Sequence, residues 1–491
     1  MANFGDTILV IDEGTTSTRA MLFAADGSCL ATRQRELAQH YPRPGWVEHD
    51  AEEIWASSLA CARAAVASGG GAERIAALGI TNQRETIVFW SRRTGRALAP
   101  AIVWQDRRTA QACADLKEKG LEPVVQEKTG LLLDPYFSAS KIAWALRHWP
   151  QLREAGEDLC AGTVESWLVF RLTGGLRISD ATNASRTALM DIGTGRWDEA
   201  LLDLWGVSAS MLPEIVDCAG PIGETLPEHF GRAIPIAGMA GDQQAASIGQ
   251  ACLAPGNSKA TFGTGAFILT HTGEELRRSR HRLLSTMAWQ LDGRRRYALE
   301  GSVFVAGSLV KWLRDDLGLL GSAAETEALA RSVPDSGGVQ IVPAHSGLGA
   351  PHWRPEARGA ISGLSFATGR AHVARAALEA MAHQTHDLMT AFEADGAPWE
   401  VLKVDGGMAS NGWLAQDLAD VLGLTVERPG FVETTALGAA MLAGVGCGMF
   451  GSLEEAASMR GAVERFEPAM AADVREARLA GWKKAVEGVL R

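Results

Sequence analysis

The sequence has no apolar run approaching the ~18 residues that a membrane-spanning helix needs. Its first residues, MANFGDTILVIDEG, contain no basic region followed by an apolar core and a cleavage site, so no export signal is indicated. The seven cysteines are scattered, odd in number and never arranged as CxxC, which argues against a zinc site and a disulfide framework. We therefore expect a cytoplasmic protein with free thiols and no membrane insertion.

The chain also has no excess of positive charge. Its 47 Lys and Arg residues are outnumbered by 58 Asp and Glu residues, which gives a formal net charge of −11. This sign excludes nucleic acid and anionic membranes as expected partners. An anionic ligand would have to be bound by local donors or by a metal ion. With 491 residues the chain is too long for one ordinary core, and two large domains are expected.

Several common catalytic motifs are absent, among them the Walker A sequence and HExxH. Gly446, Gly448 and Gly451 satisfy GxGxxG, but they follow an Ala-rich helical pattern and not a strand. A dinucleotide-binding turn requires a preceding strand, so we reject that interpretation.

A hairpin is expected at the start of the chain, where the apolar run Thr7–Ile11 leads through DEGTT into a second apolar run at residues 20–23. Its tip offers backbone N–H groups and two hydroxyls that can hold phosphate oxygens. Asp12, at the end of the strand, could hold Mg²⁺, and Arg19 follows close enough to meet phosphate charge. An ordinary hairpin with turn-forming residues explains the same pattern.

A second hairpin of the same kind is expected at residues 257–267, NSKATFGTGAF. Two Gly/Thr hairpins far apart in the sequence suggest that each half contributes one phosphate loop. We place a domain boundary near residue 250 on that ground, giving domains 1–250 and 251–491. No Pro/Ser-rich linker marks the boundary.

The segment IPIAGMAGDQQAA at residues 234–246 places Asp242 where an apolar run meets an Ala-rich helical stretch. One interpretation is a helix N-cap, with Asp242 accepting backbone N–H bonds. The other is a general base at the mouth of a cleft, approached closely because Gly238 and Gly241 carry no side chains. Gln243 would supply neutral polar groups suited to a polyhydroxy substrate.

Polar residues also lie where strands are expected to end, the position at which open α/β sheets bind ligands. Asn82-Gln83-Arg84-Glu85 separates expected strands at Arg74–Thr81 and Thr86–Trp90, and Asp405-Gly406-Gly407 follows a strand at Val401–Val404. Arg84 and Glu85 could bind the hydroxyls of one small polyol, or form a surface ion pair of little energetic value. Trp104 and Tyr136 are candidate walls of that pocket, or core residues.

Taken in order, these segments resemble the actin, hexokinase and chaperone ATPase architecture, in which two ribonuclease-H-like α/β domains flank a nucleotide cleft. Within it the chain resembles, nearly end to end, the glycerol kinases of the FGGY carbohydrate-kinase family. The motifs that carry the resemblance are DEGTTSTRA, PGWVEHD, GITNQRE, AIVWQDRR, DPYFSASK, TNASRT, AGDQQAA, FGTGAF, YALEGSVF, GLGAPHW, VDGGMASN and TALGAA.

The resemblance implies ATP-dependent phosphorylation of glycerol to sn-glycerol 3-phosphate, with ATP and Mg²⁺ as cofactors, Asp242 as general base, and a homo-oligomer (dimer or tetramer). It implies a glycerol pocket of Arg84, Glu85, Tyr136, Asp242 and Gln243, with Trp104 and Phe267 against the carbon backbone. It implies an ATP site of Thr15, Thr16, Ser17, Arg19, Thr264, Gly307, Gly407 and Asn411. Mg²⁺ is implied at Asp12, with Asp242 close by.

Two alternatives stay open: a kinase for another polyol or a pentulose, and a non-catalytic actin-like filament or chaperone ATPase. The sequence also departs from the family pattern. Lys311 replaces a usual Gln near the adenine site, and the glycine-rich insert linked to fructose-1,6-bisphosphate inhibition is absent before Arg232, so we expect no such inhibition. His229 lies where some relatives carry a phosphorylated histidine, but one neighbouring aromatic is missing, and a surface histidine without a role is the default interpretation.

Overall fold

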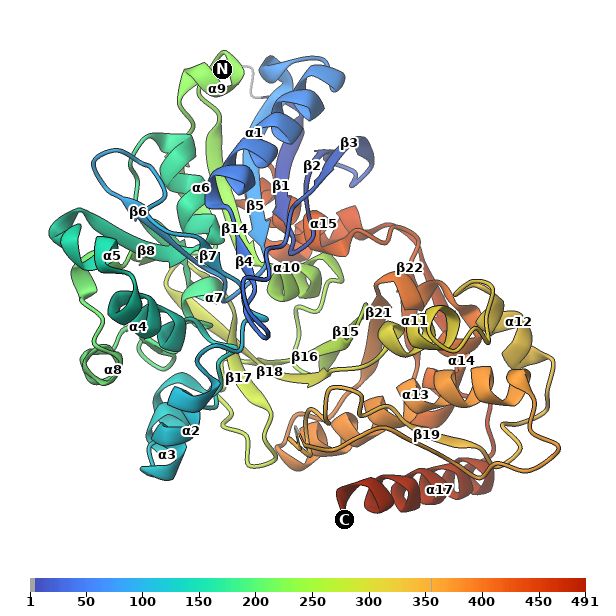
Figure 1. Ribbon diagram of the computed structural model, residues 1–491. Coiled ribbons are helices and arrows are strands. Elements are labelled where there is room, and N and C mark those ends of the chain that lie inside the picture. Colours follow the sequence, from blue (N-terminus) through green and yellow to red (C-terminus); the bar gives the residue numbers. More distant parts are fainter. Residues whose placement is uncertain (1–4, 355) are drawn as a thin grey trace.

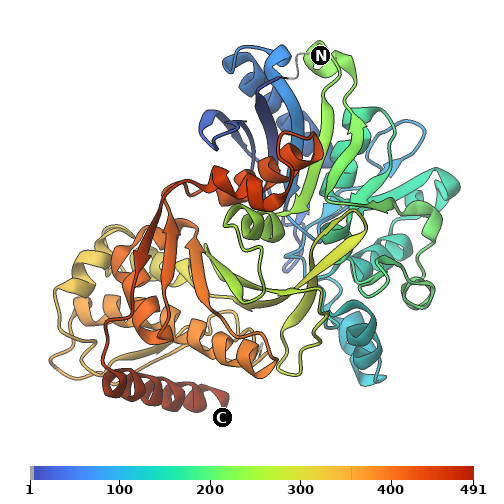
Figure 2. The ribbon, with the colours of Figure 1, turned by 180° about the vertical axis from the view of Figure 1, so that it is seen from behind.

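Two twisted sheets, in which five strands of each have corresponding positions, form the framework of the protein, one in each half of the chain (Figures 1 and 2). The computed structural model describes residues 5–354 and 356–491. The first sheet has the order β13-β14-β5-β1-β2-β3 and the second β17-β18-β16-β15-β21-β22-β23. The first contains β1 (Thr7–Glu13), β2 (Ser17–Ala24), β3 (Cys29–Glu36), β5 (Ile75–Asn82), β13 (Ala219–Glu224) and β14 (Pro235–Gly241). The second contains β15 (Asn257–Phe262), β16 (Ala266–Gly273), β17 (Leu284–Leu291), β18 (Arg294–Val303), β21 (Val401–Asp405), β22 (Val426–Pro429) and β23 (Val463–Phe466).

The strand directions repeat as well. In the first sheet β1 pairs antiparallel with β2, β2 antiparallel with β3, and β1 and β14 both pair parallel with β5. In the second, β15 and β18 pair antiparallel with β16, and β15 and β22 pair parallel with β21. This duplicated order is the ribonuclease-H-like arrangement of the actin-like ATPases, so the predicted fold class is confirmed.

Most expected strands are observed close to their predicted limits. The strands expected at Arg74–Thr81, Thr86–Trp90 and Val401–Val404 are β5, β6 (Ile87–Ser91) and β21. Every residue of β1 is buried because the strand lies between β2 and β5 with both faces covered, which explains its apolar sequence TILVI. Both Gly/Thr segments are hairpin tips, between β1 and β2 and between β15 and β16.

Helix α1 (Ala51–Ser68) begins at Asp50, whose side chain accepts a hydrogen bond from the Glu52 backbone N–H. Asp50 is therefore the N-cap of α1. Glu53, three residues further on, accepts a hydrogen bond from the backbone N–H of Ala38.

Helices α10 (Asp242–Gly249) and α15 (Thr434–Gly446) each follow the last parallel strand of their sheet and pack against each other. Their contact is close: a Cβ at Gly438 would lie 1.8 Å from the Ala245 carbonyl oxygen, and one at Gly249 would lie 2.0 Å from that of Thr434. Helix α15 also covers β1, β5 and β14, so the late part of the chain returns to the first sheet (Figure 1). The segment joining the two sheets runs from the end of α10 to Asn257, where β15 starts.

The remaining elements of the N-terminal half include a separate four-stranded sheet, β4-β7-β6-β8. They are β4 (Glu48–His49), β7 (Ala101–Ile102), α2 (Ala110–Glu118), α3 (Glu122–Thr129), α4 (Ser138–His148), α5 (Pro150–Glu154), β8 (Leu159–Thr163), α6 (Val164–Thr173), β9 (Ile178–Asp180), α7 (Ala181–Ala184), β10 (Met190–Asp191), β11 (Arg196–Trp197), α8 (Glu199–Trp205), β12 (Glu214–Val216) and α9 (Pro227–Phe230).

The C-terminal half adds helices to its own sheet, including the long α13. These elements are α11 (Gly307–Asp315), α12 (Glu325–Arg331), β19 (Gln340–Val342), β20 (Ala360–Ser362), α13 (Arg370–Ala394), α14 (Gly412–Leu422), α16 (Leu453–Ala456) and α17 (Ala472–Leu490). Within the described ranges, no helix combines the length and apolarity needed to cross a bilayer.

Candidate active site

The tip of the first hairpin is a tight turn closed by the Gly14 N–H, which donates to the Ser17 carbonyl at 3.0 Å. Asp12, on β1 beside this tip, is 4% exposed, and its Oδ2 accepts no hydrogen bond from the described residues. Burial raises the pKa of Asp12 to about 6, against the opposing charge of Arg19. A buried carboxylate oxygen with an unused lone pair suits a hard cation such as Mg²⁺.

Arg19 does not stand free beside the hairpin tip. Its Nη2 lies 3.3 Å from Asp12 Oδ2, and its Nη1 donates to Glu433. The guanidinium thus already faces two carboxylates, one of them just before α15. A phosphate at the tip would share Arg19 with these partners.

The second hairpin tip is held against the start of α11. The Thr264 carbonyl accepts hydrogen bonds from the backbone N–H groups of Ala306 at 2.9 Å and Ser308 at 3.1 Å. A Cβ at Gly307 would lie 2.6 Å from the Gly263 carbonyl oxygen, so only glycine fits there. The structure therefore brings together Thr264 and Gly307, two of the residues expected at the nucleotide.

Gly406 and Gly407, the two glycines that follow β21, differ in their surroundings. Gly406 has φ +86°, and a Cβ there would lie 2.6 Å from the Phe262 carbonyl oxygen, whereas nothing lies within 4 Å of a Cβ at Gly407. Gly407 thus offers the bare backbone on which a nucleoside could lie. The side chain of Asn411 is buried and already bonded, accepting from Leu414 N at 3.0 Å and donating to Thr326 Oγ1 at 3.2 Å.

Arg84 and Glu85 lie between β5 and β6 and are 2% and 1% exposed. They are not a surface ion pair. Glu85 has φ +63°, a left-handed conformation that is unusual for a residue other than glycine, and Ser138 Oγ donates to its carbonyl at 2.9 Å. Strain of this kind persists where the surrounding structure holds a functional side chain in place.

Asp242 completes this cluster. Its Oδ1 lies 3.2 Å from Arg84 Nε, and Arg84 Nε lies 3.8 Å from Glu85 Oε1. The N-cap of α10 is Gly241, and no side-chain cap bond is formed, so Asp242 is the first helical residue and not the cap. About a third of its side chain stays exposed, which leaves the carboxylate accessible to a ligand.

The pKa of Asp242 is raised from its ordinary value, because burial outweighs the positive charges of Arg84 and Lys259. A helix N-terminus would favour the ionised carboxylate, but the loss of water around it has the larger effect. The higher basicity suits the role of proton acceptor.

Aromatic side chains wall the cluster. The ring of Trp104 lies 5.5 Å from Tyr136 and 6.4 Å from Phe267, centroid to centroid, and all three side chains are only partly buried. They border the cluster without being fully buried, so they remain candidate walls of a substrate pocket. Trp104 Nε1 donates to Thr15 Oγ1 at 2.9 Å, which ties this pocket to the first hairpin.

The two glycines before Asp242, Gly238 and Gly241, allow other parts of the protein, rather than a ligand, to approach closely. A Cβ at Gly241 would lie 2.7 Å from Arg84 Cγ, and one at Gly238 would lie 2.3 Å from the backbone nitrogen of Ala443 in α15. Gly241 thus allows Arg84 to reach Asp242, while Gly238 allows the helix to approach the sheet.

Sequence reasoning missed three charged residues of this region: Arg186, Lys259 and Glu300. All three are buried. Lys259 Nζ donates to Gln243 Oε1 and, at 2.8 Å, to Thr261 Oγ1. Charged residues inside otherwise apolar strands, as in NSKATF and YALEGSVF, were the available signal, since unpaired charges are rarely buried.

His229 was expected at the surface and is not. It is 8% exposed, its ring lies 5.3 Å from Trp55 in an edge arrangement, and Nε2 lies 3.2 Å from the Arg171 carbonyl oxygen. Because His229 lies on α9, the packing of α9 against α1 explains its burial.

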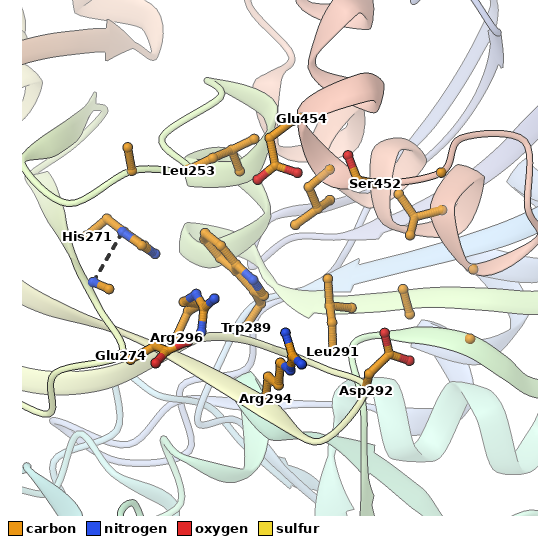
Figure 3. Close-up of a pocket in the computed structure, with 18 of the residues that line it drawn as sticks. Leu253, His271, Glu274, Trp289, Leu291, Asp292, Arg294, Arg296, Ser452 and Glu454 are labelled. Atoms are coloured by element: carbon orange, nitrogen blue, oxygen red, sulfur yellow. Dashed lines mark hydrogen bonds and ion pairs between the residues drawn. The ribbon is translucent and has the colours of Figure 1, made fainter.

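A cavity of about 770 Å³ lies apart from this cluster, next to the segment that joins the two sheets. Its lining includes Leu253 and Trp289, and Figure 3 shows Glu454 and Ser452 facing Arg294 across it. None of the residues predicted for the active site lines it.

Comparison with known proteins places this geometry in a family. Residues 7–249 match the model of the N-terminal domain of the FGGY family of carbohydrate kinases, and residues 258–447 match that of the C-terminal domain. The chain belongs to the FGGY family of carbohydrate kinases. Among its relatives, the glycerol kinase of Rhodospirillum centenum is 55% identical over 483 residues, covering 98% of this chain and 97% of the relative. That of Gluconobacter oxydans is 54% identical over 490 residues, covering 99% and 96%.

Solved structures of FGGY kinases share the architecture. The glycerol kinase of Plasmodium falciparum, crystallised with ADP, superposes with a TM-score of 0.94 at 36% identity, over 99% of this chain and 98% of the other. The xylulose kinase of Lactobacillus acidophilus superposes with a TM-score of 0.87 over 99% and 97%, at 21% identity, which shows the fold alone. The predicted family and kinase class are thus confirmed for this FGGY member.

Proposed function

We propose that the protein transfers the γ-phosphoryl group of ATP to a terminal hydroxyl of glycerol and releases sn-glycerol 3-phosphate. The observation that carries the proposal is the cluster of buried Arg84 and Glu85 with the partly exposed Asp242, bordered by aromatic rings and joined to the first hairpin through Trp104. Such a pocket suits a small polyol. The identity of more than 50% to glycerol kinases over nearly the whole chain supports the same substrate.

In this mechanism the pocket fixes the acceptor. Arg84 and Glu85 donate to and accept from neighbouring hydroxyls, Tyr136 and Gln243 complete the polar contacts, and Trp104 and Phe267 contact the carbon backbone. Phosphoryl transfer depends mainly on alignment and charge stabilisation, so holding one hydroxyl in line with the γ-phosphorus supplies much of the rate. Asp242 then accepts the proton of that hydroxyl as it attacks.

The phosphates lie between the two hairpins, near Thr15, Thr16 and Ser17 on one side and Thr264 on the other, with the adenosine near Gly307, Gly407 and Asn411. Mg²⁺ would be held by Asp12, with Asp242 nearby, because Asp12 Oδ2 is buried and accepts no hydrogen bond from the described residues. The ion would neutralise phosphate charge when bound. Arg19 would share its guanidinium between Asp12, Glu433 and the phosphates.

The site draws on both sheets, so we propose domains 1–250 and 251–491 that close on the ligands and exclude water. The seven cysteines, all free, are compatible with action in the cytoplasm, where ATP and a reducing environment are available. Assembly as a dimer or tetramer is proposed from the family resemblance.

A coupled assay of ADP release tests the proposal, with glycerol, erythritol and xylulose supplied separately at equal concentrations. We expect ATP turnover to rise sharply with glycerol and little with the other two. Preference for erythritol or xylulose would assign a different FGGY acceptor. A rate of ATP turnover that is unchanged by all three compounds would exclude this function.

A further inference from the structure

Glu300 is a buried carboxylate that the proposed chemistry does not use. It lies on β18, in the second sheet, and is 1% exposed. Its strand neighbours in the pairing register are Leu269 and Leu284, so the local sequence gives it no polar partner. An ionised carboxylate in such surroundings must be paired with charges from elsewhere.

Both partners come from the other half of the chain. Arg84 donates from Nη1 to Glu300 Oε2 at 2.6 Å and from Nη2 to Oε1 at 3.2 Å, a two-pronged contact that fixes the plane of the guanidinium. Arg186, which follows α7, donates from Nη2 to Glu300 Oε1 at 2.9 Å. Burial by itself would raise the pKa of Glu300, but Arg186 and Arg84 lower it to about 2, so the group is ionised.

Arg84 and Arg186 each link Glu300 to a residue of the proposed polyol pocket. With both Nη atoms of Arg84 engaged, its Nε faces Asp242 at 3.2 Å. Arg186, held by the same carboxylate, donates from Nε to Glu85 Oε1 at 2.6 Å. One side chain of the second sheet therefore orients two neighbouring residues proposed to bind the polyol.

We infer that Glu300 is a positioning residue for the polyol pocket, which holds Arg84 directly and Glu85 through Arg186 in the geometry that binds glycerol. This inference rests on the proposed function. It adds a charged residue to the part that the second sheet, through Phe267 on β16, already plays in acceptor binding. It also makes the pocket complete only when the two sheets are in contact at β18.

Glu300→Gln tests the inference, because it keeps the size of the side chain and removes its charge. We expect the KM for glycerol to rise by about tenfold or more, the usual scale for loss of a group that orients a ligand-binding side chain, while the KM for ATP stays within about twofold. A merely structural role would reduce the amount of active enzyme and leave both KM values unchanged.

Asp417→Asn is the matched control. Asp417 is a buried carboxylate of the C-terminal half that also accepts two hydrogen bonds from one arginine, Arg478, at 2.6 and 3.0 Å. We expect it to lower the melting temperature and leave the KM for glycerol unchanged. If Glu300→Gln does not fold, Glu300→Asp tests the inference in its place. It keeps the charge on a shorter side chain and should still raise the KM for glycerol several-fold.

A folded Glu300→Gln variant, or a Glu300→Asp variant in its place, with the wild-type KM for glycerol overturns the inference. The wild-type enzyme is assayed first in the same series. Failure of the wild type to phosphorylate glycerol would refute the proposed function and is thereby distinguished from failure of the role of Glu300.

Discussion

At the scale of single residues, burial sets the chemistry of the site. Asp12 and Asp242 are carboxylates whose pKa values are raised by loss of water, while Glu300 is kept ionised by two guanidiniums. The same neighbourhood therefore holds one acid suited to accept a proton and another suited to remain charged. Groups of one type with pKa values pushed apart are typical of acid–base sites.

The raised pKa of Asp12 predicts how the enzyme depends on Mg²⁺. Below pH 6 the carboxyl is largely protonated and binds the cation poorly, so the Mg²⁺ concentration for half-maximal activity should rise as pH falls through 6. Titrations with Mg²⁺ at pH 5.5, 6.5 and 7.5 measure this. Asp12→Asn should need more Mg²⁺ at every pH and lose the dependence. An equal requirement in wild type and variant would rule out Asp12 as the metal site.

Glu13 predicts a pH dependence of stability. It is fully buried, accepts a hydrogen bond from Ser58 Oγ at 2.7 Å, and burial raises its pKa to about 8. The unfolded group ionises near pH 4.5, so the folded state binds the extra proton between pH 4.5 and 8, and stability falls as pH rises through that window. Glu13→Gln removes this slope.

We expect Glu13→Gln to raise the melting temperature at pH 8 by about 2 °C or more and to change it little at pH 5. Thermal unfolding followed by circular dichroism at both pH values is the measurement. An equal effect at the two pH values would show that Glu13 does not carry the proton.

At the scale of elements, the contact between α10 and α15 positions Asp242, because the first residue of α10 is the proposed base. Gly438 and Gly249 allow the two helices to approach so closely. The ordering of the site thus depends on a helix that arrives from near the end of the chain.

Gly438→Ala should therefore disturb both stability and activity. Its Cβ would lie 1.8 Å from the Ala245 carbonyl oxygen, and forced overpacking of this kind typically costs ~1–3 kcal/mol. Gly488→Ala in α17 is the control, since nothing lies within 4 Å of its Cβ and a helical alanine should be neutral or stabilising by up to ~1 kcal/mol. The free energy of unfolding of both variants is measured by chemical denaturation. A loss of stability in Gly438→Ala no greater than that in Gly488→Ala would contradict the packing argument.

The sequence predicts elements better than it predicts their partners. Strands such as β5 and β21 follow from apolar runs ended by glycine or polar residues, and the two hairpin tips follow from local turn chemistry. The pairing of Arg84 with Glu300 spans 216 residues, and no local pattern encodes it. The burial of His229 likewise depends on Trp55, which is distant in sequence on α1. The hydrogen bond of Arg19 to Glu433, beside α15, is also a contact between distant segments.

At the scale of the whole molecule, the β17–β18 hairpin joins the two halves. Gln244 Nε2 donates to Thr286 Oγ1 at 3.1 Å, Gln290 Nε2 to Asp217 Oδ1 at 2.8 Å, and Arg295 Nη1 to the Gly193 carbonyl at 3.0 Å. These bonds attach a hairpin of the second sheet to the first half. We expect closure of the cleft to pivot near this hairpin while α11–α14 move toward the first half.

Small-angle X-ray scattering tests the expected closure. The radius of gyration should decrease when glycerol and a non-hydrolysable ATP analogue are both bound, and less with the nucleotide alone. Closure excludes water from the γ-phosphate, which explains why ATP turnover should require the acceptor. Identical scattering with and without both ligands would contradict the expected motion.

Asp242 is proposed to accept a proton from glycerol as the γ-phosphoryl group is transferred. The most direct measurement is single-turnover phosphorylation of glycerol by wild type and Asp242→Asn, with glycerol binding measured separately by calorimetry. We predict that the variant binds glycerol nearly as well and that its transfer rate falls by ~10² or more, the scale of a lost general base. A transfer rate close to that of the wild type would contradict the account.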